Sequence, residues 1–113
     1  IFHNGYGFDG YIWQTMRRLQ NKPLDWSYIN RMIDTLCLSR AYRFGIQPDR
    51  ANFVAWQYKM LTIRSRAKGM GASLGSMARE FQIPYDERLA HDAGYDIDVN
   101  YKVFQKLLWS IEI

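Results

Sequence analysis

The chain has 113 residues, of which 48% are hydrophobic and 16% aromatic, so it is too apolar to be disordered and long enough for at most one domain. Its one cysteine cannot form an internal disulfide, and no apolar run reaches the roughly 18 residues of a membrane span. We therefore expect a cytoplasmic protein that does not contact a membrane. The net charge of +4 suits a polyanionic partner.

The first third of the chain predicts a strand, a turn and a helix. Residues 1–4 read as the end of a buried strand, which the glycines at positions 5 and 7 interrupt. A helical stripe then predicts a helix over about 9–20; it consists of Phe8, Ile12, Met16 and Leu19. A second apolar segment at about 31–36 predicts a strand parallel to the first, because a helix lies between them.

The rest of the chain predicts two further helices. Residues 42–71 fit neither the helical nor the strand period. A helix is expected over 73–82, where Ser73 can cap the start and Pro84 ends the pattern. The last helix is expected over about 92–111. We find no repeat or linker, and residues 1–113 therefore read as one continuous unit.

Two carboxylates stand out against this pattern. Asp96 falls within about 20° of Val103 and Leu107 on the last helix, so it lies on the core-facing stripe, either paired to an arginine or stabilised by the helix dipole. Asp9 follows the first strand, where it can cap a helix or face a ligand. If the two carboxylates converge, their mutual repulsion favours a cation between them.

Four segments in order give the chain a resemblance to a known family. They are "HNGYGFD", "IDTLCLSR", "SLGSMAREF" and "HDAGYD". In order and spacing they resemble the second and third motifs of the DEDDh 3′-to-5′ exonucleases, the superfamily of the proofreading epsilon subunit and the Trex-like enzymes. The spacing of His91 and Asp96 is that of the histidine subclass. The resemblance implies an α/β ribonuclease-H-like exonuclease fold.

The resemblance also implies a mechanism and a substrate. Two Mg²⁺ or Mn²⁺ ions would bridge the phosphate at the 3′ end of a nucleic acid, DNA being favoured over RNA. Asp9 and Asp96 would be metal ligands, and His91 would be the general base. Asn4 would contact the terminal nucleotide or stabilise its own turn. A basic segment would bind the phosphate backbone or be a solvated surface; it contains Arg64, Arg66 and Lys68.

One element of the family pattern is missing. The first motif, Asp-x-Glu on an earlier strand, does not precede "HNGYGFD". We therefore expect a fragment that lacks the first strands of the exonuclease domain and is nearly inactive alone. Two alternatives stay open: a catalytically dead nucleic-acid-binding module, and a domain of a larger replication or repair protein.

Overall fold

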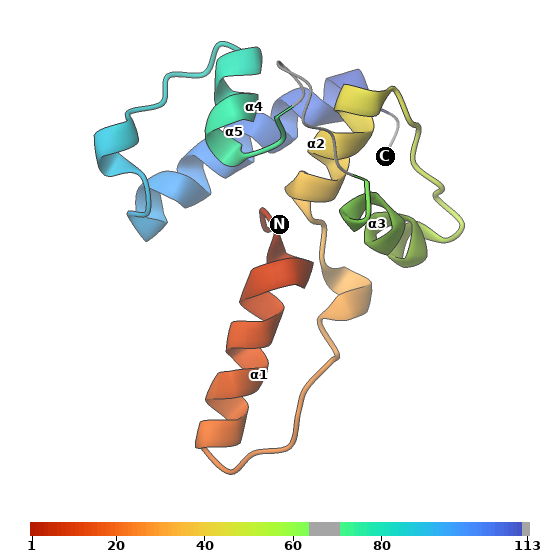
Figure 1. Ribbon diagram of the computed structural model, residues 1–113, viewed down its shortest axis with the longest axis vertical. Coiled ribbons are helices and arrows are strands. Elements are labelled where there is room, and N and C mark those ends of the chain that lie inside the picture. The colour runs from red at the N-terminus through yellow and green to blue at the C-terminus, as the bar shows by residue number, and fades with distance from the viewer. Residues whose placement is uncertain (64–70, 112–113) are drawn as a thin grey trace.

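The computed structural model describes residues 1–63 and 71–111, and these form helices joined by loops (Figure 1). The α-helices are α1 (Gly10–Leu19), α2 (Thr35–Phe44), α3 (Phe53–Leu61), α4 (Leu74–Glu80) and α5 (Ala93–Ser110). Three short helical turns accompany them, η1 (Gly5–Asp9), η2 (Ile29–Arg31) and η3 (Glu87–Leu89). The helices expected over 9–20, 73–82 and 92–111 are confirmed by α1, α4 and α5.

The predicted α/β ribonuclease-H-like fold is wrong, because the described residues contain no strand and no sheet. The segments 1–4 and 31–36 do meet in parallel, but only at one isolated bridge between Phe2 and Asp34. There the Phe2 amide donates to the Ile33 carbonyl at 2.9 Å, and the Thr35 amide donates to the Phe2 carbonyl at 2.7 Å. A single bridge does not make a strand.

The error has a local cause in the second apolar segment. A short apolar run fits a buried strand and a buried helix equally well. Here the run from Leu36 to Leu38 is the first turn of α2, because the Asp34 side chain accepts the Leu36 amide and caps the helix. The helix ends at Phe44 and is followed by Gly45, whose φ of 67° suits a residue without a Cβ.

The core lies where four helices meet. Helix α2 packs against α3 and α5, and α5 also packs against α4. The largest fully buried apolar side chains come from all four: Leu38, Met60, Met77, Val103 and Leu107. Helix α3 covers part of the region that had no clear period, and it buries Trp56, Gln57 and Met60 on one side.

Helix α1 extends away from this core (Figure 1). The only residues it buries are Gly10 and Gln14, whereas Leu19 is 80% exposed and its other apolar side chains also face outward. Over the described ranges, no helix combines the length and apolar character needed to cross a membrane.

Candidate functional site

The loop before α1 is built around the buried carboxylate of Asp34. One oxygen, Oδ1, accepts the Asn4 amide at 2.7 Å and the Leu36 amide at 3.0 Å, and Oδ2 accepts the Tyr6 amide at 3.1 Å. Burial raises the pKa of the Asp34 carboxyl, and the amides that donate to it act in the opposite direction. Asp34 therefore fixes the segment "HNGYGFD" to the start of α2, in addition to capping that helix.

A second polar contact holds the loop after α1 against the helix. Gln14 is 2% exposed, and its side chain bonds to the backbone of Asp25 in both directions. Its Nε2 donates to the Asp25 carbonyl, and its Oε1 accepts the Asp25 amide at 2.9 Å. Tyr28, further along this loop, packs its hydroxyl against Gly10, where a Cβ would displace it. The loop therefore runs back beside α1.

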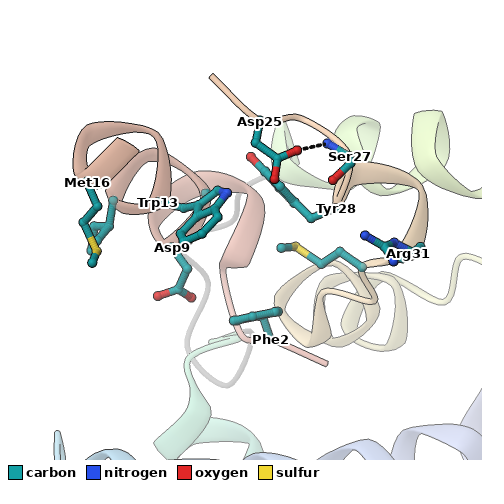
Figure 2. Close-up of a pocket in the computed structure, with 11 residues that line it drawn as sticks. Phe2, Asp9, Trp13, Met16, Asp25, Ser27, Tyr28 and Arg31 are labelled. Atoms are coloured by element: carbon teal, nitrogen blue, oxygen red, sulfur yellow. Dashed lines mark hydrogen bonds between the residues drawn. The ribbon is translucent and has the colours of Figure 1, made fainter. Parts of the chain in front are cut away.

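A cavity of about 450 Å³ opens between α1 and this returning loop (Figure 2). Aromatic rings form much of its wall, with charged groups among them; the lining residues are Phe2, Asp9, Gly10, Ile12, Trp13, Met16, Asp25, Ser27, Tyr28, Arg31 and Met32. In Figure 2, Trp13 lies on α1 opposite Tyr28 and Arg31 on the returning segment. The volume lies in the range of small-molecule sites.

Asp9 lines this cavity, and its carboxylate does not cap α1. It occupies the N-cap position of α1, yet its side chain makes no capping hydrogen bond within the described chain. Burial raises the pKa of the Asp9 carboxyl, and the negative charge of Asp34 adds to the effect. Both causes disfavour the anion, so a cation or a hydrogen-bond donor placed beside Asp9 would be stabilised.

His91 and Asp96 form a separate pair at the start of α5. His91 has a φ of 72°, and its amide donates to Asp96 Oδ2 at 3.0 Å. Asp92 caps the helix by accepting the Tyr95 amide at 3.0 Å. The other Asp96 oxygen, Oδ1, is buried and has no hydrogen-bond partner among the described residues. Asp96 therefore holds the start of α5 with one of its two oxygens.

The structure does not bring all the predicted ligands into one cavity. Asp9 lines the cavity beside α1, and neither His91 nor Asp96 does. Across residues 1–63 and 71–111, no three His, Cys, Asp or Glu side chains gather where they could hold a metal ion. The assignment of Asp9 and Asp96 as metal ligands, and of His91 as general base, stays a prediction.

The remaining predictions concern residues that would contact the nucleic acid, and the structure describes only one of these residues. Asn4 adopts a left-handed conformation with φ of 62°, and its backbone amide donates to Asp34, whereas its side chain makes no capping hydrogen bond. Its predicted side-chain role stays a prediction. Three predicted phosphate-binding residues lie outside the described residues: Arg64, Arg66 and Lys68.

Sequence reasoning missed several residues that build the cavity. Gln14 was not singled out, although it is the buried side chain that positions the returning loop. Trp13 and Tyr28 were not singled out. The available signal was the three aromatic residues followed by three basic residues in "FDGYIWQTMRRLQNK", a composition typical of nucleic-acid-binding surfaces.

Comparison with protein-family models, with curated proteins and with solved structures found no match to this chain.

Proposed function

We propose that this chain binds the 3′ end of single-stranded DNA as the substrate-binding part of a 3′-to-5′ exonuclease. The observation that carries the proposal is the position of Asp9. This residue belongs to the motif behind the family resemblance, and its uncapped carboxylate lies at an aromatic-walled cavity large enough for a small ligand.

The cavity offers suitable chemistry for a terminal nucleotide. Trp13 and Tyr28 present ring faces on which a base can stack, whatever its identity. Arg31 is exposed at the cavity and can bind a backbone phosphate. The Asp9 carboxylate can accept a hydrogen bond from a free 3′-hydroxyl, whereas it would repel a 3′-phosphate.

The described residues alone do not provide enough ligands for the two-ion site that the resemblance implies. Asp9 and Asp96 lie on different elements, and over the described ranges no third ligand joins either of them. Two carboxylates are too few to displace the water shells of two Mg²⁺ ions. We therefore assign binding and orientation of the strand end to this chain and no ion-dependent step, and we expect little or no digestion by the chain alone.

The test compares the affinity of the chain for single strands that differ only at their 3′ end. A labelled oligo-dT strand with a free 3′-hydroxyl should bind at least about 10-fold more tightly than the same strand with a 3′-phosphate, because the phosphate adds negative charge beside Asp9. Asp9→Asn should remove most of this preference. The matched control is Asp98→Asn, which changes an exposed carboxylate of α5 paired with Lys102 and should leave the preference intact.

Three outcomes decide the proposal. Equal affinity for the two strands, or for a linear and a circular strand, would contradict end recognition. An end preference that survives in Asp9→Asn would move the recognition away from this cavity. An RNA strand of the same sequence measures whether the sugar is distinguished, since the resemblance permits either nucleic acid.

A further inference from the structure

A second hollow lies on the surface of α1, beside the cavity that Asp9 lines (the Asp9 cavity). It has a volume of about 260 Å³, and its lining includes Phe8 and Tyr11 together with Gly7 and Thr15. Ile12 and Met16 line both this hollow and the Asp9 cavity, so these two side chains form a ridge between them. A flexible strand that leaves one hollow can therefore enter the other by crossing a single apolar ridge.

Each side of the ridge combines an aromatic ring with an arginine. Arg17 lies four residues after Trp13, and its guanidinium stands 5.6 Å from the centre of that ring. Arg18 lies seven residues after Tyr11, which places the two within about 20° of each other on the helix surface. Helix α1 thus carries both rings that can stack on bases and cations that can bind phosphates.

The exposure and charge of this face identify its occupant. Phe8 is 60% exposed and Tyr11 is 64% exposed. Residues 9–31 carry four Lys or Arg against two Asp, a balance of +2. Helix α5 also exposes apolar side chains, but its charges cancel, with two Lys against two Asp. A partner that is both aromatic and anionic fits the face of α1 and has no special affinity for that of α5.

We propose that a single strand of nucleic acid continues from the Asp9 cavity across Ile12 and Met16 into the second hollow. Its bases stack on Phe8 and Tyr11, and Arg17 and Arg18 bind its phosphates. The placement of the 3′ end in the Asp9 cavity rests on the proposed function; the stacking surface on α1 does not.

The test removes the rings while keeping apolar area. In the double variant Phe8→Leu with Tyr11→Leu, affinity for a circular oligo-dT strand should fall about 10-fold or more, because each lost base–ring stack weakens binding on that scale. A circular strand has no end, so this measurement is independent of end recognition. The matched control is Tyr101→Leu, which removes a ring that is 52% exposed on α5 and should not change the affinity.

A charge variant tests the phosphate contacts separately. Arg18→Gln should reduce the slope of log affinity against log salt by about 0.7, the value for one phosphate contact on a single strand. Lys106→Gln, an exposed cation on α5, should leave the slope unchanged. Circular dichroism of each variant checks that its helices are retained.

The outcomes separate this inference from the proposed function. Unchanged affinity of the double leucine variant for the circular strand would overturn the stacking surface, even if end preference persists. Weaker binding by that variant without any end preference would support the surface and contradict the exonuclease proposal. The chain could instead fail to bind the strand but bind anionic lipid vesicles or associate with itself. If the leucine variant retained that behaviour, the face would be assigned to a membrane or to a second copy.

Discussion

Helices α1 and α5 both expose apolar side chains, but they are held in the molecule by different forces. Helix α5 buries a continuous apolar stripe against its neighbours, and Val99, Val103 and Leu107 on it are at most 1% exposed. Helix α1 buries only Gly10 and Gln14. Its position depends on hydrogen bonds. Gln14 bonds to the returning loop, and the Asp34 carboxylate accepts backbone amides of the turn before the helix.

This difference shows which exposed apolar face needs a partner. On α5 the exposed apolar residues lie opposite a well-packed stripe, so burial on the other side already holds this helix in place. On α1 the amphipathic pattern is turned outward: the apolar side faces solvent and a glutamine faces the protein. The face of α1 is therefore the better candidate for binding.

The largest effect is expected where α5 is packed. Leu107→Ala should lower the free energy of unfolding by about 2–5 kcal/mol, because it empties a fully buried site in the core. The neighbouring Leu108, 48% exposed, provides the control, and Leu108→Ala should change stability by less than about 0.5 kcal/mol. Denaturant unfolding of both variants measures the difference. Equal losses would mean that the buried stripe of α5 does not hold it in place.

A smaller effect is expected at the contact that joins the N-terminal segment to α5. His3 Nδ1 lies 2.8 Å from the Thr35 hydroxyl, which in turn lies 2.7 Å from Asn100 Oδ1 on α5. Burial lowers the pKa of His3 from 6.5 to about 4; the Ala72 backbone acts against this shift and the Arg40 charge adds to it. The folded chain therefore keeps His3 neutral at pH values where the unfolded chain protonates it.

The sign of the pH effect follows from this lowered pKa. The contribution of neutral His3 to stability is complete above pH 6.5 and is lost as the pH falls toward about 4, a loss of about 2–3 kcal/mol. Urea unfolding at pH 7 and pH 4.5 should show a smaller acid loss for His3→Gln than for the unmodified chain. His91→Gln is the control at an exposed histidine. Identical acid losses in all three proteins would contradict the burial of a neutral His3.

Sequence patterns identified the helices whose periodicity is strong and failed where a short run was ambiguous. The stripes of α4 and α5 are long enough to give the helical period, and Ser73 caps α4 as predicted. The run from Leu36 to Leu38 carries no period, and only the tertiary bonds of Asp34 reveal a capped helix. The fold class was inferred from that run and from a resemblance, and the all-helical structure of the described residues contradicts it.

The candidate site was predictable only in part for a related reason. Asp9 could be identified from its motif, since a carboxylate at the end of an apolar segment is conspicuous. The cavity around it could not, because it depends on a returning loop held by Gln14, and a lone glutamine in a helix gives no sign that it is buried. The cavity arises from a contact between positions 14 and 25, which no local pattern records.

The smallest effect on overall stability, and the most local one, is expected at Gln14. Gln14→Met keeps a similar length and helix propensity but removes both bonds to the Asp25 backbone, so the free energy of unfolding should fall by about 1–2 kcal/mol. Amide hydrogen exchange is the sharper measurement. Protection should decrease in α1 and in the loop at 20–28, and it should stay unchanged in α5, because α5 is held by apolar burial. Gln105→Met, on the exposed side of α5, is the matched control and should alter neither helix. Unchanged protection of α1 in Gln14→Met would show that other contacts hold the helix, and the contrast drawn between α1 and α5 would fail.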